Sequence, residues 1–293
     1  MTRKHVGIVL LIALGVVTVG RQTSAQQPAP PGELSRALER SNLSAESKAR
    51  LRSKAGELVG VGVAESDIAD VIRQGAVRGV QTPELIRLLD VVGEAKHHGL
   101  PPRPVADKIK EGLAKGVPPE RIVSVASRVA GYLASARDLV RRAEQAGVRV
   151  EVPSDRERAV EAVADVLGRG VPRNEVEELA GRIGASSSRG ATMSRFQAGT
   201  QVTADLIAMG LSPRAASETV GAALARGMNQ RDIERLRERL AQELRRGESP
   251  ENGAKRLREQ IRSEAPETRG DHSSPDRQGK GRDGIGDGKP GRR

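Results

Sequence analysis

Glycine followed by an apolar residue recurs at intervals along this chain and ends a short helical pattern each time. The stretch GLPPRPVADKIKEGLAKGVPPERI, residues 99–122, contains two such pairs with one helical pattern between them. Glycine adopts positive φ without the penalty that a Cβ brings, so it stops a helix, and the apolar residue after it folds back on the last turn. The recurrence therefore predicts many short helices joined by tight turns.

Four copies of this pattern align without gaps when each is numbered from its first residue, which is Gly62, Gly99, Pro153 or Gly210. Positions 7, 11 and 15 are apolar in every copy and lie four apart, so they form one stripe of an α-helix. The stripe consists of Ile68, Val105, Ala159, Ala216, Ile72, Ile109, Val163, Val220, Ala76, Leu113, Leu167 and Leu224. The stop glycine is at position 18, as Gly79, Gly116, Gly170 and Gly227, and position 19 is Val80, Val117, Val171 and Met228. The alignment predicts one amphipathic helix before each stop.

Helix start signals follow these stops. Thr82-Pro83, Ser212-Pro213 and Ser249-Pro250 each combine an N-cap residue with proline at the first helical position, and Ser154 to Glu157 has the form of a capping box. Each break is therefore specified by both a stop signal and a start signal.

The spacing of the copies predicts the architecture. The first two copies begin 37 residues apart, but the next intervals are 54 and 57 residues, so each contains one extra helix length, which we place near residues 127–147 and 193–209. We expect an all-α fold, an irregular helical-hairpin repeat array of about eleven antiparallel helices in units of ~37 residues, from near Ser44 to near Ile261. A closed helical bundle is the alternative, in which the extra helices lie across one face of the array.

Two local features refine this prediction. Small residues inside the first helix of several units, Gly75, Gly112 and Ala223, predict close approach between helices. The alternating valines of GVRVEV, residues 147–152, fit either an extended linker or a strand, and we favour the linker because a strand without a partner is marginal.

The two ends of the chain differ in character from its middle. Residues 1–25 have a basic start, an apolar run and small residues before Gln26, which predicts a secretory signal peptide, with an uncleaved anchor as the alternative. Residues 26–43 are expected to form a linker and N-terminal lead-in, residues 44–263 the helical repeat domain, and residues 264–293 a disordered mixed-charge tail. The protein is accordingly expected to be exported, to the periplasm or the extracellular space, and its mature chain to have no transmembrane span.

Composition narrows the classes of partner. The chain has no cysteine, so it has no disulfide framework, and its one Tyr, one Phe and no Trp make nucleic acid an unlikely partner because single strands stack on aromatic rings. Removing residues 1–25 takes away three basic and no acidic side chains, so the net charge falls from +11 to 11 − 3 = +8. This balance favours anionic partners.

Charged positions recur with the repeat. Position 17 is basic in every copy, as Arg78, Lys115, Arg169 and Arg226, and a stack of hairpins would align these side chains as a ladder that binds an anionic polymer or lipid. The alternative is that each cation only complements the dipole at a helix C-terminus. Position 9 is acidic in every copy, as Asp70, Asp107, Glu161 and Glu218, which predicts either solvated salt bridges or pairing between units.

We expect no catalytic, cofactor-binding or metal-binding residues. The adjacent His97 and His98 point about 100° apart on a helix, and no serine nucleophile motif or phosphate-binding glycine loop occurs. The sequence therefore predicts a non-enzymatic scaffold that binds a protein or peptide partner. The alternative is an envelope-associated adaptor that binds an anionic polymer or lipid through the repeated basic edge.

Signal cleavage is testable on the exported protein. Cleavage before Gln26 predicts an intact mass that begins at this residue, measured by mass spectrometry after expression with the native N-terminus. A mass that retains residues 1–25 would instead indicate the uncleaved anchor.

Overall fold

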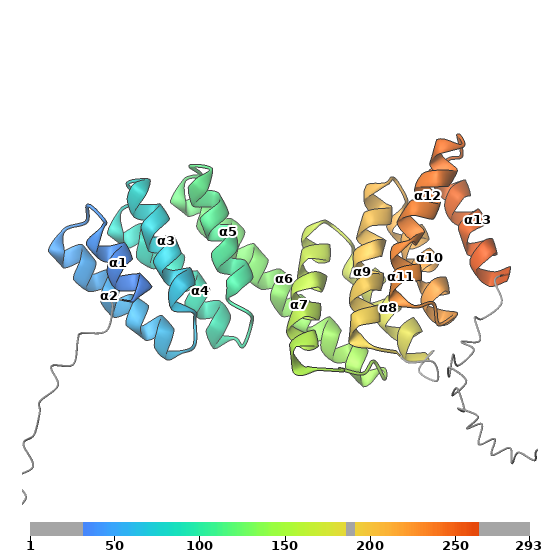
Figure 1. Ribbon diagram of the computed structural model, residues 1–293, viewed down its shortest axis with the longest axis horizontal. Coiled ribbons are helices and arrows are strands. Elements are labelled where there is room, and N and C mark those ends of the chain that lie inside the picture. The colour runs from blue at the N-terminus through green and yellow to red at the C-terminus, as the bar shows by residue number, and fades with distance from the viewer. Residues whose placement is uncertain (1–31, 186–190, 264–293) are drawn as a thin grey trace, which may run out of the picture.

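A computed structural model describes residues 32–185 and 191–263, and these form thirteen helical segments. Figure 1 shows them as an elongated array with α1 and α13 at opposite ends. The segments are α1 (Glu33–Glu39), α2 (Ala45–Gly60), α3 (Glu65–Val77), α4 (Thr82–His97), α5 (Arg103–Ala114), α6 (Pro119–Gln145), α7 (Pro153–Gly168), α8 (Arg173–Ala185), α9 (Met193–Ala208), α10 (Pro213–Ala225), α11 (Gln230–Glu234), α12 (Leu236–Arg245) and α13 (Pro250–Ser263).

The helices alternate between two layers. In most of the array a helix packs against the next helix and against the helix two further along the chain, with α11 and α12 counted as one, but α5 and α7 pack on α6 rather than on each other. One layer contains α1, α3, α5, α7, α9 and the α11–α12 pair, and the other contains α2, α4, α6, α8, α10 and α13. The 27-residue α6 packs against α4, α5, α7 and α8, so it joins the two halves of the array. The predicted all-α helical repeat array is therefore confirmed. The helices form an open array and not the closed bundle that was the alternative prediction (Figure 1).

The predicted glycine stops are the helix ends. Nine glycines in the described residues have positive φ, and all four stop glycines at position 18 are among them. At the end of α5, the N–H of Gly116 donates to the carbonyl of Leu113 at 3.1 Å and the N–H of Val117 to that of Gly112 at 3.0 Å, which is the Schellman pattern. The same pair of bonds closes the helices before Gly62, Gly79, Gly99, Gly147, Gly170, Gly210, Gly227 and Gly247.

The predicted apolar stripe lies in the core between the layers. Eleven of its twelve residues are buried, and Ala76 is half-buried. Of the residues after the stops, Val171 is buried and Val117 is half-buried against the same core. Because burial of apolar surface is the main favourable term in folding, this stripe accounts for the attachment of each helix to its neighbours.

Small helix residues permit close packing, as predicted. A Cβ on Gly75 would lie 2.2 Å from Cδ2 of Leu85, and one on Gly112 would lie 2.7 Å from Cγ1 of Ile122. Both pairs join position 14 of a unit to position 24, so the same contact recurs within consecutive hairpins.

Some helix starts differ from the sequence prediction. Ser212 and Ser249 accept hydrogen bonds from backbone N–H groups three residues on, as expected of N-caps. At α4 the predicted N-cap Thr82 is instead the first helical residue, since Gln81 precedes the helix and the Glu84 carboxylate accepts from its N–H at 3.0 Å. At α7 the helix begins at Pro153, so Ser154 does not cap it.

The helical part also begins earlier than predicted. Within the expected linker and lead-in of residues 26–43, Glu33–Glu39 forms α1, because Ala37 and Leu38 are buried against the array and packing stabilises a helix too short to persist alone. The extra helix predicted near residues 193–209 is α9, whereas that near residues 127–147 is part of the unbroken α6. The segment around Arg149 is extended, with one isolated parallel bridge to Thr192. The predicted signal peptide and disordered tail lie outside the described residues.

Polar contacts fix neighbouring helices within each layer. Lys54 of α2 pairs with Asp90 of α4 at 2.7 Å, and Lys110 of α5 pairs with Asp67 of α3 at 3.1 Å. In the C-terminal half, Asp205 of α9 pairs with α7 and with α12, at 2.8 Å from Arg169 and 3.0 Å from Arg237. These contacts fix the axial position of each of these helices relative to its neighbour in the layer.

Within residues 32–185 and 191–263, none of the helices combines the length and the apolar character needed to span a membrane.

A matched pair of glycine substitutions tests the stop mechanism. A Cβ would meet no atom within 4 Å at either Gly79, where φ is +71°, or Gly131 inside α6. We expect Gly79→Ala to lower the free energy of unfolding by about 1 kcal/mol, since it strains the backbone, and Gly131→Ala to raise it by roughly 0.5–1 kcal/mol. Denaturant unfolding measures both, and a change of the same sign in the two variants would contradict the mechanism.

Candidate functional site

The four predicted ladder residues are the C-cap residues of their helices. Arg78 caps α3, Lys115 caps α5, Arg169 caps α7 and Arg226 caps α10, each directly before a glycine with positive φ. A cation there lies next to the negative end of the helix dipole. The helix-end explanation therefore accounts for the basic residue type at position 17.

Three of these side chains have identified contacts inside the array. The guanidinium of Arg78 donates to the carbonyl of Ala114 at the end of α5. Lys115 pairs with Glu111 one turn before it, at 2.5 Å, and Arg169 pairs with Asp205 of α9. Arg78 and Arg169 thus join neighbouring helices of one layer.

The fourth ladder residue lies elsewhere, because the extra helix α9 changes the layer of everything after it. Helices α3, α5 and α7 share one layer, whereas α10 packs beside α8 and α13 in the other. Each short turn reverses the chain direction, so α10 also runs opposite to α7. Arg226 is consequently not on the edge that carries Arg78, Lys115 and Arg169, and the four do not form one ladder.

The acidic residues at position 9 mostly pair within their own helix. Asp70 contacts Arg73 at 2.5 Å, Asp107 contacts Lys110 at 2.7 Å and Glu218 contacts Arg214 at 3.0 Å. Burial, with the nearby Glu157, raises the pKa of Glu161. Contact between units in this region instead comes from Asp67, which shares Lys110 with Asp107.

A basic groove of about 620 Å³ lies between α8, α10 and α13. Its floor is formed by Ala222 and Ala225 of α10, and Gly221 lies beneath one of its arginines. Arginines line it from all three helices, and one carboxylate, that of Glu218, joins them. The arginines are Arg182, Arg226, Arg258 and Arg262. Four cations against one anion make this recess electropositive, and guanidinium groups are suited to bidentate contact with carboxylates or phosphates.

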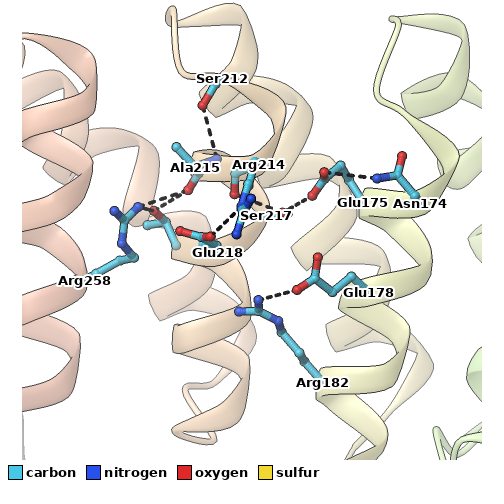
Figure 2. A network of polar contacts seen from close by, with 11 residues as sticks. Asn174, Glu175, Glu178, Arg182, Ser212, Arg214, Ala215, Ser217, Glu218 and Arg258 are labelled. Carbon is cyan, nitrogen blue, oxygen red and sulfur yellow. Dashed lines mark hydrogen bonds and ion pairs between the residues drawn. The ribbon is translucent and has the colours of Figure 1, made fainter.

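Arg182 lies directly over a glycine of the facing helix. A Cβ at Gly221 would be 2.6 Å from Cδ of Arg182 and 2.8 Å from its Nη1. Glycine inside a helix costs roughly 0.5–1 kcal/mol relative to alanine. The absence of a side chain here makes room for the arginine to lie across α10, while Glu178 one turn before holds its Nη2 at 2.5 Å (Figure 2).

Arg258 is held on the other side of the groove by α10 itself. Its Nη1 donates to Oγ1 of Thr219 at 3.1 Å and to the carbonyl of Ala215 at 3.3 Å. Figure 2 shows Arg258 reaching toward Ala215 of α10. Thr219 is fully buried and donates in turn to the Ala215 carbonyl at 2.7 Å. Both identified acceptors are neutral, so they orient the guanidinium without neutralising its charge.

A buried polar contact joins α8 and α10 beside the groove. The hydroxyl of Ser217 donates to the carboxylate of Glu175, and both residues are buried (Figure 2). A buried polar group without a hydrogen-bond partner destabilises the fold, so this contact favours one axial position of α10 relative to α8. It therefore fixes the relative position of the helices that carry Arg182 and Gly221.

Sequence reasoning singled out two of the charged groove residues, Arg226 and Glu218, and missed Arg182, Arg258 and Arg262. These three lie on two helices that are separated by about 75 residues of sequence, so their approach depends on the layer change at α9. Two signals were available: arginines four residues apart on α13, and the interior glycine Gly221.

Potential metal ligands do not gather in the described residues. In residues 32–185 and 191–263, no group of three or more His, Cys, Asp and Glu side chains is placed to hold a metal ion. His98 is the exposed C-cap of α4, and its carbonyl accepts from the Arg137 guanidinium at 2.5 Å.

No protein-family model matches the chain, and a comparison with curated proteins finds no match. Among solved structures, the chain is similar to the crystal structure of a de novo designed helical repeat protein, with 18% sequence identity, coverage of 73% of this chain and 96% of that chain, and a TM-score of 0.24.

The contact of Lys115 with its own helix can be tested by titration. Hydrogen bonds from Lys108 and then Lys115 lower the pKa of Glu111 to about 2. We expect Lys115→Gln to raise this pKa and Lys108→Gln to raise it further, as measured by carbon NMR of the carboxyl group. In the wild-type chain, any stabilisation from this carboxylate is complete above its ordinary pKa and is lost as the pH falls through about 2. An unchanged pKa in Lys115→Gln would show that Lys115 does not engage Glu111.

Proposed function

We propose that this chain is a non-enzymatic helical-repeat scaffold that binds a protein or peptide partner. The observation that carries the proposal is the open two-layer array, in which the substantial contacts join helices no more than three apart in the chain. Arrays of this kind present an extended surface to partners. We further propose that the scaffold acts after export, to which the basic and apolar start of residues 1–25 would direct it.

The use of polar side chains supports a scaffold over an enzyme. The basic residues that the sequence singled out cap helix ends, and two of them, Arg78 and Arg169, also join neighbouring helices. Such contacts maintain the shape of the array and carry out no chemistry.

An adaptor that binds an anionic polymer or lipid is the second candidate. The basic groove between α8, α10 and α13 favours it, since four arginines meet there. The edge that carries Arg78, Lys115 and Arg169 supports it less, because each of these side chains has a contact within the array.

The absence of cysteine from the chain allows a direct test of partner binding. Single cysteines at exposed positions along the array, Val77→Cys, Arg128→Cys and Arg262→Cys, would each carry a photo-crosslinker on the full exported chain. A partner should crosslink from some of these positions and not from others when the labelled protein is mixed with envelope extract. Mass spectrometry identifies the product, and the heat-unfolded labelled chain is the control. No protein crosslinked above that control from any position would contradict the proposal.

A further inference from the structure

We propose that the groove between α8, α10 and α13 binds an acidic peptide segment, with carboxylates held by Arg182 on one side and by Arg258 and Arg262 on the other. This inference rests on the scaffold function proposed above and specifies the chemistry of its partner. The site would be a short part of the array near its C-terminal end.

The charge of the groove selects an anionic ligand. Its lining contains four arginines and one glutamate, and including the adjacent Arg214, Glu178 and the buried Glu175 leaves an excess of 5 − 3 = 2 positive charges. Arg258 and Arg262 lie four residues apart and so face the same side of α13. A segment that lies along this side would place successive acidic residues near both.

The groove is also preorganised. Gly221 leaves the space that Arg182 occupies, and Thr219 with the Ala215 carbonyl orients Arg258 before any ligand arrives. Side chains that are already ordered lose less conformational entropy on binding. An interior glycine beneath an arginine has an intrinsic cost in helix stability, which a role in positioning this side chain explains.

The floor of the groove favours a peptide over a phosphate polymer or a lipid surface. Ala222 and Ala225 form an apolar floor against which the methylene groups of acidic side chains can pack, and a polyphosphate chain has no such groups. The carboxylate of Glu218, which pairs with Arg214, can also accept a hydrogen bond from a peptide N–H, a donor that a polyphosphate chain does not have. The arginines line a recess between helices rather than a flat face, which suits a chain that enters it more than a bilayer surface.

Binding of fluorescein-labelled hexaglutamate to the full exported chain, measured by fluorescence anisotropy, tests the inference. We expect Arg182→Gln combined with Arg262→Gln to weaken binding about tenfold or more, the scale of losing charge-assisted hydrogen bonds. The matched control combines Arg121→Gln with Arg128→Gln, which removes the same charge from exposed positions of α6 and should leave the affinity within about twofold. Raising the salt concentration should weaken wild-type binding.

Two further variants separate positioning from charge. Gly221→Ala should weaken binding although it removes no charge, because the added methyl group displaces Arg182. Arg182→Lys keeps the charge but loses the planar fork, so it should weaken binding too. Thermal unfolding, monitored by circular dichroism, checks that each variant is folded. If Gly221→Ala does not fold, Arg182→Lys tests the positioning of the guanidinium in its place.

Several outcomes would overturn the inference. These are no binding of hexaglutamate to the wild-type chain, an equal loss in the Arg121 and Arg128 control, or tighter binding of polyphosphate or of phosphatidylglycerol vesicles through the same arginines. If hexaglutamate does not bind but a partner still crosslinks, the groove inference fails and the scaffold function stands. If neither binds, both fail.

Discussion

The structure depends on one repeated constraint, a helix end closed by a glycine with positive φ. Each of the nine ends uses the same two backbone hydrogen bonds, as at Gly116, and eight of the nine glycines are followed by an apolar residue. The turn therefore satisfies two helix-end carbonyls and directs the chain back toward the core in the same step. Where no such glycine with positive φ intervenes, as between Pro119 and Gln145, the helix continues and becomes the connection between the two halves of the array.

The two layers are held by different forces. Between layers the contact is apolar and formed by the repeated stripe, whereas within a layer polar pairs such as Lys54–Asp90 and Asp205–Arg237 fix each helix against the next. Apolar packing is non-directional, so it holds the two layers together but does little to fix how far one helix is shifted along its axis relative to the next. Directional polar contacts instead fix the position of each helix along its axis relative to its neighbour. This division explains why so many charged side chains in the array have structural partners.

The extra helix α9 has the largest consequence for function. It moves α10 into the layer of α8 and α13, which separates Arg226 from the other basic residues at position 17 and places it with Arg182, Arg258 and Arg262. The predicted basic edge is thus divided, and a basic groove takes its place in the C-terminal half. An irregularity in the repeat therefore brings these four arginines to one groove.

The sequence by itself determined the helices, their apolar stripes and their stops, because these follow from local rules: the 3.6-residue period, the freedom of glycine and the caps at Ser212 and Ser249. It also predicted the all-α repeat array and placed α9. Tertiary structure alone decided that Glu33–Glu39 is helical, that Gly221 lies beneath Arg182, and that arginines from α8, α10 and α13 share one groove. These features depend on which layer each helix joins and on its axial position there. Both are set by contacts between residues distant in sequence, and such contacts leave no periodic signal in the chain.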